Sequence, residues 1–244
     1  MNQTQNPVLT EKAFNQEVAT LAGEKMTLSG VIKKSVLLLA IVVIFGIFGW
    51  NFAHHPYGII ALFASIITGL ILALIIIWKK HTAPVLAPVY AVVEGCALGI
   101  ISRIFESQYE GIVVQAVLVT MSIFMGMLFA YKFKLIRVTQ RFAKVIIFAT
   151  AGIAIYYLLN LAFMFFGGNL PLINSNSIYG ILFTLFVAGI AALNLILDFD
   201  FIEQSIERGV AKYMEWYASF GLLVTLVWLY IEVLRLISKI RGRR

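Results

Sequence analysis

Charged residues and cysteines are scarce in this chain. Only 13% of its 244 residues are charged and 61% are hydrophobic, whereas ordinary soluble domains carry roughly 25% charged residues. The single cysteine, Cys96, excludes an intrachain disulfide, and three histidines without a CxxC pair offer no metal-binding constellation. These scarcities argue against a soluble domain and against a disulfide or zinc scaffold. They indicate an integral membrane protein.

Catalytic motifs are also missing. The three histidines, His54, His55 and His81, lie at expected helix ends, and the sequence contains neither HExxH nor GxSxG. A retinal protein needs a lysine within its last helix to form a Schiff base, but the first lysine of the last apolar stretch is Lys239, at its rim. We therefore expect neither an enzymatic activity nor a bound cofactor.

Long apolar runs dominate what is present. A membrane-spanning helix needs about 20 mostly apolar residues, and seven windows meet this requirement: 35–52, 57–78, 85–104, 112–131, 143–166, 177–198 and 214–237. The sequence predicts an all-α integral membrane bundle of seven helices over residues 35–238. A polar segment over 1–34 precedes it and a basic tail over 239–244 follows. No cleavable signal peptide is expected before the first window.

The distribution of basic residues predicts the topology. The net charge of +7 comes from residues in short connections rather than from a solvated patch, so we expect no nucleic-acid binding. Of the connections, those on the amino-terminal side carry nearly all of the Lys and Arg, and only Arg103 lies on the opposite side. The positive-inside rule therefore predicts a cytoplasmic amino terminus.

The carboxyl-terminal segment conflicts with that rule. A seventh full span would carry five basic residues outward: Arg235, Lys239, Arg241, Arg243 and Arg244. The segment either spans the membrane, held by its packing, or dips in and returns. Because the earlier helices dominate the overall orientation, we favour seven spans.

Two acids lie well inside the predicted helices, at a cost of about 3 kcal/mol each on insertion scales. They are Glu94 and Glu232, and Arg235 lies near the end of the last helix. Steps of three and four residues place Thr225, Glu232 and Arg235 on one helical face. A simple interpretation is that Glu232 only pairs with Arg235 one turn away.

The stretch LDFDFIE, residues 197–203, adds two further candidates. Asp198 and Asp200 are about 200° apart around a helix and cannot face the same cavity. Asp198 continues a polar line that begins at Asn194, whereas Asp200 shares its face with the expected solvated rim. We nominate Asp198 as the intramembrane acid and Asp200 as the second choice. A charged helix exit without a function is the alternative.

If Asp198 and Glu232 approach each other, they would share a proton and form a pH sensor, because two adjacent carboxylates do not both ionise cheaply. An acidic cavity would also attract cations, and ligands that are all oxygen suit Ca²⁺ in transit. Arg235 would then need another carboxylate, and we predict an ion pair with Glu94. Asn194 and Thr225 would complete a polar stripe.

Three motifs carry a resemblance: YAVVEGCALG at 90–99, LDFD at 197–200 and LYIE at 229–232. With the order of seven short-looped helices, they resemble the transmembrane Bax inhibitor motif (Bax inhibitor-1) family, in particular its bacterial, YccA-like branch, over about residues 20–240. The resemblance implies six helices around the last one, a bacterial inner-membrane location, and a pH-sensitive calcium leak channel with a di-aspartyl sensor. Asp198, or else Asp200, and Glu232 would match the sensor acids. This chain departs from the pattern in having Glu rather than Asp at 232 and a longer segment over 208–227.

A non-conducting regulator is the rival interpretation. Such a protein would bind a membrane protease or a stress-response partner, and small residues such as Ala151, Gly152, Gly180 and Gly189 would let partner helices approach closely. A channel needs its intramembrane acids, whereas an adaptor tolerates their loss. The sequence alone does not separate the two.

Overall fold

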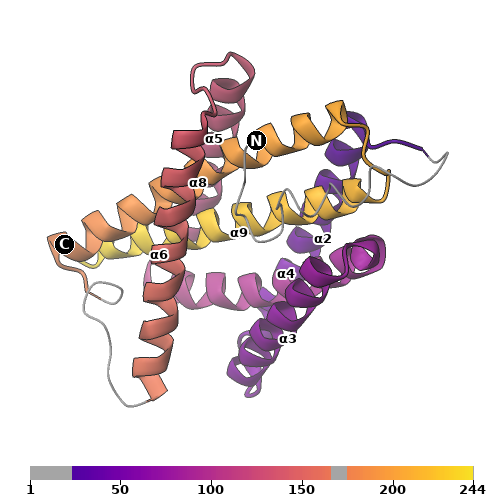
Figure 1. Ribbon diagram of the computed structural model, residues 1–244. Helices are drawn as coiled ribbons and strands as arrows, with labels where there is room; N and C mark the ends of the chain where they lie inside the picture. The colour runs from indigo at the N-terminus through magenta and orange to yellow at the C-terminus, as the bar shows by residue number, and fades with distance from the viewer. Residues whose placement is uncertain (1–23, 166–174, 244) are drawn as a thin grey trace. The chain divides into compact units, whose positions relative to one another are not determined.

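The computed structural model describes residues 24–165 and 175–243. This part of the chain forms seven long helices and one 3-10 turn (Figure 1): α2 (Leu28–Phe52), α3 (Gly58–Trp78), η1 (Lys80–Thr82), α4 (Ala83–Gln108), α5 (Ile112–Lys132), α6 (Gln140–Phe165), α8 (Ile178–Glu207) and α9 (Met214–Arg241). All seven helices are long and apolar enough to cross a membrane. The predicted all-α, seven-helix membrane bundle is confirmed, and the chain is a multi-pass membrane protein. Residues 1–23 of the predicted amino-terminal segment and residues 166–174, which include the end of the predicted window 143–166, lie outside the described residues.

Several helices are longer than their apolar windows. α2 begins at Leu28 rather than at residue 35, because the Thr27 side chain accepts a hydrogen bond from the Gly30 amide and caps the helix there. α8 continues past Asp198 to Glu207, and α9 continues to Arg241. Polar residues at the membrane surface therefore stay helical.

The helices group into two compact units. The first, here the α2–α4 unit, comprises residues 24–108 and 200–224 of the described chain. The second, the α5–α6 unit, comprises residues 109–165, 175–199 and 225–243. Because α8 and α9 are continuous helices, each contributes one part to each unit.

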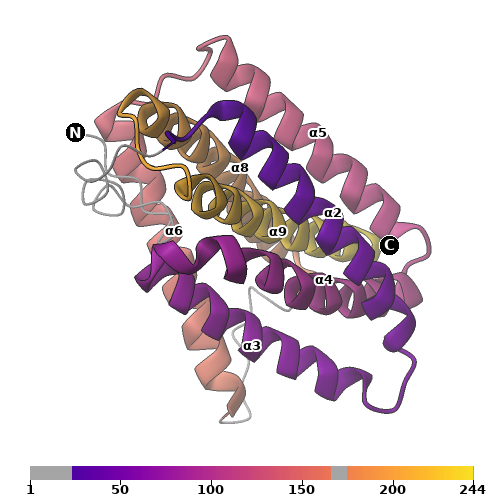
Figure 2. The same ribbon diagram turned by 90° about the vertical axis from the view of Figure 1, so that its right-hand side faces the viewer.

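In the α2–α4 unit, α2 and α4 pack backbone against backbone (Figure 2). A Cβ atom added to Gly99 would overlap the Gly46 carbonyl oxygen, and one added to Gly95 would lie 2.7 Å from the Val42 carbonyl oxygen. The contacts advance along both helices in the same direction, so α2 and α4 are parallel. Helix α3 packs on α4 as the intervening antiparallel helix.

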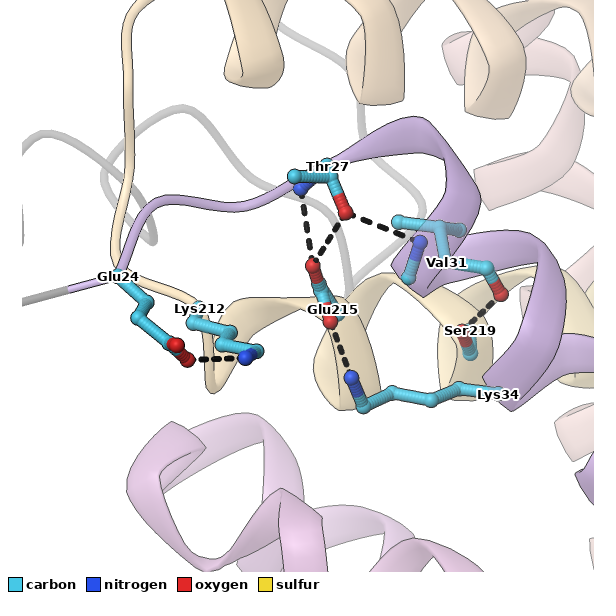
Figure 3. A network of polar contacts seen from close by, with 8 residues as sticks. Glu24, Thr27, Val31, Lys34, Lys212, Glu215 and Ser219 are labelled. Atoms are coloured by element: carbon cyan, nitrogen blue, oxygen red, sulfur yellow. Dashed lines mark hydrogen bonds and ion pairs between the residues drawn. The ribbon is translucent and has the colours of Figure 1, made fainter.

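A polar network joins the start of α2 to the start of α9 (Figure 3). Glu215 is only 1% exposed and accepts hydrogen bonds from the Thr27 amide at 2.9 Å and the Thr27 hydroxyl at 3.0 Å. It also pairs with Lys34. One turn further along α9, the Ser219 hydroxyl donates to the Val31 carbonyl at 3.0 Å.

The chain before α2 extends this network. The Met26 amide donates to the Val210 carbonyl at 2.8 Å, and the Lys212 amide donates to the Glu24 carbonyl at 2.9 Å. The side chains of Glu24 and Lys212 form an exposed ion pair at the edge (Figure 3). The α8–α9 connection is therefore tied to the beginning of α2.

In the α5–α6 unit, an apolar cluster holds α6 and α8 together, and the Trp228 side chain of α9 packs against it. The buried members of the cluster are Ala143, Ile146, Ile147, Ile153, Val187, Ile190 and Leu197. α8 and α9 run antiparallel and side by side in this unit (Figures 1 and 2). In agreement with this, the Lys239 ammonium near the end of α9 donates to the Thr184 hydroxyl near the start of α8.

Burial separates the inner helices from the outer ones. In their membrane windows, 61% of the residues of α8 and of α9 are buried, against 17% for α5 and 22% for α6. The last helix is therefore enclosed, as expected, and α8 is enclosed to the same extent. Asp198, Asp200 and Glu232 lie on these two helices, whereas Glu94 lies on α4.

Candidate functional site

Glu232 is one of the two buried acids of α9. Its side chain is 1% exposed. The Tyr157 hydroxyl of α6 donates to its Oε1 at 2.8 Å, and the Arg235 guanidinium lies 3.3 Å from the same oxygen. Arg235 also stacks on the Tyr157 ring, 5.4 Å from the centroid. Two donors from two helices thus hold one carboxylate oxygen, and Trp228 lies against the carboxylate from one turn earlier.

A second base faces this acid. Lys239 lies two turns after Glu232 and is 6% exposed. Its ammonium donates to the Gly180 carbonyl at 3.2 Å and to the Thr184 hydroxyl at 2.8 Å. The local pairing of Glu232 with Arg235 that the sequence left open is therefore formed, and Lys239 contributes further positive charge near it.

Two bases near the end of α9, Lys239 and Arg241, are hydrogen-bonded within the protein. Besides the bonds of Lys239, the Arg241 guanidinium donates to the Glu110 carbonyl at 2.7 Å. Carbonyl oxygens and a hydroxyl therefore accept hydrogen bonds from these two basic side chains. The sequence alone did not indicate these partners. This offsets part of the cost of ending an apolar helix with bases.

Asp198 is 0% exposed, on the part of α8 that belongs to the α5–α6 unit. Asn194, one turn earlier, is 4% exposed and donates to the Thr150 hydroxyl of α6 and to the Ile190 carbonyl, each at 2.9 Å. Thr225 on α9 is also buried, at 4%. The polar stripe named from the sequence is therefore made of buried groups.

The register of α8 and α9 separates Asp198 from Glu232. Lys239 bonds to Thr184; Asp198 lies fourteen residues after Thr184, and Glu232 lies seven residues before Lys239. At 1.5 Å per residue these distances are about 21 and 10 Å along antiparallel axes, so the two acids are offset by about 10 Å. Glu232 bonds to Tyr157 and Arg235, and the proton shared between Asp198 and Glu232 stays a prediction.

The match to known families covers nearly the whole chain. A family model described as Bax inhibitor 1 like matches residues 6–242. The chain belongs to the Bax inhibitor 1 like family. Searches of curated proteins and of solved structures found no match. The family match agrees with a membrane protein of seven helices. It assigns no role to the individual acids, which are argued here from the geometry.

In this Bax inhibitor 1 like protein, Asp200 has a different environment from Asp198. It is half-buried and accepts a hydrogen bond from the Gln204 amide at 2.7 Å. Glu203 and Glu207, which add negative charge near it, are exposed. Asp200 thus lies at the rim, on the part of α8 that belongs to the α2–α4 unit.

Glu94 lies on α4 in the α2–α4 unit, half-buried beside the Tyr90 hydroxyl. Its carboxylate faces Gly69 of α3, where an added Cβ would lie 3.3 Å from Oε2. Arg235 belongs to the other unit, where it contacts Glu232 and Tyr157. The ion pair between Glu94 and Arg235 stays a prediction.

Sequence reasoning missed Tyr157 and Glu215. Tyr157 is one of two adjacent tyrosines in the middle of an apolar helix, and that position was a usable signal for a buried hydroxyl. Glu215 had no such signal, because its partners Thr27 and Lys34 are more than 180 residues away. Among the described residues, no group of three or more His, Cys, Asp or Glu side chains could hold a metal ion.

Proposed function

We propose that this Bax inhibitor 1 like protein is a cation leak channel for Ca²⁺, gated by protonation of the buried carboxylates of α8 and α9. The observation that carries the proposal is Glu232, an acid that is 1% exposed within the apolar part of an enclosed helix. Ionisable residues at such depth are rare and normally line ion or proton pathways. The proposal assigns the chain no enzymatic activity and no bound cofactor.

The two acids would act as successive sites along one helix pair. Carboxylate oxygens are ligands that Ca²⁺ prefers, and Asp198 and Glu232 lie on adjacent helices about 10 Å apart along the axis. Arg235 occupies Glu232 in this conformation, so Ca²⁺ would enter only when the guanidinium moves away. Protonation of Glu232 removes the charge that attracts the ion, and flux should fall as the pH is lowered.

Calcium uptake into proteoliposomes containing the purified protein, measured from pH 5 to pH 8, tests the proposal. Glu232→Gln and Asp198→Asn should each reduce the flux and flatten its pH dependence. Glu203→Gln is the matched control, because Glu203 is exposed on the same helix as Asp198. Unchanged flux and pH response in both buried-acid variants would refute the carboxylate gate.

The alternative is a non-conducting regulator that binds another membrane protein, such as a membrane protease or a stress-response partner. Ala151 and Gly152 are exposed on α6, and a Cβ on Gly152 would meet no described heavy atom within 4 Å. A partner helix would fit closely there. On this alternative, Gly152→Leu would abolish activity in the cell while Glu232→Gln would preserve it.

We place the chain in the bacterial inner membrane with its amino terminus in the cytoplasm, on the strength of the imbalance in basic residues. In a Cys96→Ala background, cysteines at the exposed positions Ser107, Arg208 and Arg243 should label from opposite sides. Ser107 and Arg243 should share one side and Arg208 the other. Labelling of Arg243 and Arg208 from the same side would show that α9 does not cross.

A further inference from the structure

Glu94 lies at the depth of the membrane centre. The residue it faces, Gly69, is the twelfth of the 21 residues of α3. At 1.5 Å per residue it lies about 16 Å from the first residue of that helix and about 14 Å from the last. A hydrocarbon core is about 30 Å thick, so the Glu94 carboxylate is near its middle.

A notch in α3 receives this carboxylate. Gly69 has no side chain, which leaves space beside the Glu94 carboxylate. A Cβ atom added to Gly69 would lie 3.3 Å from Glu94 Oε2, 3.8 Å from the Tyr90 ring and 3.9 Å from the Val93 side chain. α3 is the least enclosed helix, with 11% of its membrane window buried. Gly69 itself is buried on the face of α3 that packs on α4, while most of the other residues of the helix are exposed.

Neither α3 nor α4 supplies a base at this level. α3 contains no Asp, Glu, His, Lys or Arg. On α4 the nearest base is Arg103, nine residues further and thus about 13 Å along the helix. Its guanidinium donates to His54 at 2.8 Å and stacks on Trp50. On these two helices only the Tyr90 hydroxyl reaches Glu94.

The other helices of the unit do not supply a base either. The lysines of α2, Lys33 and Lys34, lie in its first two turns, and Lys34 is paired with Glu215. At the start of α9, Phe220 meets the Tyr90 ring edge-on at 4.9 Å. The titratable residues of that segment are Glu215 and Tyr217, which bring no positive charge.

An ionised carboxylate with no cation beside it is strongly disfavoured at this depth. We propose that Glu94 and the notch at Gly69 form a protonation site, a neutral carboxyl group open to apolar reagents and separate from the acids of α8 and α9. The ligand is a proton. The site does not depend on the proposed calcium function.

Dicyclohexylcarbodiimide is a suitable probe because it partitions into lipid and reacts with protonated carboxyl groups. The carboxyl proton goes to one carbodiimide nitrogen, and a carboxylate oxygen bonds to the central carbon to give an O-acylisourea. The acyl group then migrates from oxygen to nitrogen and leaves a stable N-acylurea. No atom departs, so the modified peptide gains the full mass of the reagent.

The experiment treats the full-length protein in liposomes with this reagent at pH 6 and at pH 8 and maps the product by peptide mass spectrometry. Glu94 should be modified about tenfold faster than the exposed Glu203, because burial favours the neutral form. A water-soluble carbodiimide should reverse that preference. Modification of Glu94 should be slower at pH 8 than at pH 6.

Variants locate the site. Gly69→Leu fills the notch and should reduce modification of Glu94 about tenfold, whereas Gly126→Leu, at an exposed glycine of α5 with no described atom within 4 Å of an added Cβ, should leave it unchanged.

An unmodified Glu94 in the wild-type protein at both pH values would overturn the proposal. Modification that appears only in Arg235→Gln would also overturn it, by showing that Glu94 is held in an ion pair. Equal modification in Gly69→Leu would show that the notch is not the site. The readout is covalent labelling, so the absence of calcium flux would refute only the channel.

Discussion

Glycines at the contact of α2 with α4 lie against neighbouring backbone, whereas one glycine on each of α5, α6 and α8 in the α5–α6 unit faces open space. A Cβ on Gly49 would overlap the Cys96 carbonyl, and one on Gly99 would overlap that of Gly46. On Gly126, Gly152 and Gly189, an added Cβ would meet no described atom within 4 Å. The first set allows helices to touch and fixes their positions. The second set leaves room, and it belongs to the unit that contains Asp198 and Glu232.

The largest expected effect comes from adding a methyl group where α2 and α4 touch. Gly99→Ala forces α2 away from α4 and should lower the free energy of unfolding by about 3 kcal/mol, the upper part of the range for overpacked cores. Gly152→Ala is the matched control, with an expected change of no more than about 1 kcal/mol in either direction. Equilibrium unfolding in mixed detergent micelles measures both. Equal losses in the two variants would remove the distinction between the units.

The buried ion pair of the α2–α4 unit comes next. Glu215→Gln removes the charge that holds Lys34 and weakens the bonds from Thr27, all at a site that is 1% exposed. Breaking such a pair typically costs about 3 kcal/mol, and the retained amide should limit the loss to about 2 kcal/mol. The same unfolding assay applies. A loss recovered by the double variant Glu215→Gln, Lys34→Gln would identify the unpaired lysine as its cause.

The α5–α6 unit should respond less. Tyr157→Phe removes the hydroxyl that donates to Glu232 at 2.8 Å and should cost about 1 to 2 kcal/mol, because a hydrogen bond to a charged group is lost. Tyr156→Phe is the control, since the Tyr156 ring packs on Phe183 and this contact survives the loss of the hydroxyl. If Tyr156→Phe proves as costly as Tyr157→Phe, the bond to Glu232 is not what stabilises this region.

The smallest effect should come from the exposed edge of the network in Figure 3. Glu24 raises the pKa of Lys212, through their hydrogen bond first and its charge second. A lysine whose pKa is raised in the folded state contributes stability at every pH below the ordinary lysine pKa, near 10.4. That contribution is lost only as the pH rises beyond this value. Both side chains are largely exposed, so Glu24→Gln should leave thermal stability unchanged from pH 6 to pH 8. A clear loss of stability in this pH range would show that the contacts of the chain before α2 depend on this ion pair.

Hydrophobic windows predicted the seven helices well because burial in lipid is recorded in each residue's own polarity. They placed helix ends poorly, as with α2 at Leu28, because capping by Thr27 and continuation through charged residues depend on hydrogen bonds rather than on hydropathy. The spacing of Gly95 and Gly99 was a usable signal for close helix contact. It was not used.

The candidate site was predicted residue by residue more readily than as a geometry. Asp198 and Glu232 stand out because acids are rare in apolar runs, and both are buried. Their offset along α8 and α9 could not be read from the sequence, because the register depends on contacts such as that of Lys239 with Thr184. The ties of Arg241 are equally hidden, since its partner is a backbone carbonyl that any residue would provide.

The contact between Glu215 and Thr27 also has a meaning in time. The two residues are 188 positions apart in the chain, and at synthesis rates of about 5 to 20 residues per second the second is made about 10 to 40 s after the first. During that interval α2 lacks the carboxylate that binds its cap residue Thr27, and Lys34 lacks its counter-ion. A chain that stops before α9 would keep this end unfinished, with an unpaired lysine that quality-control proteases could recognise.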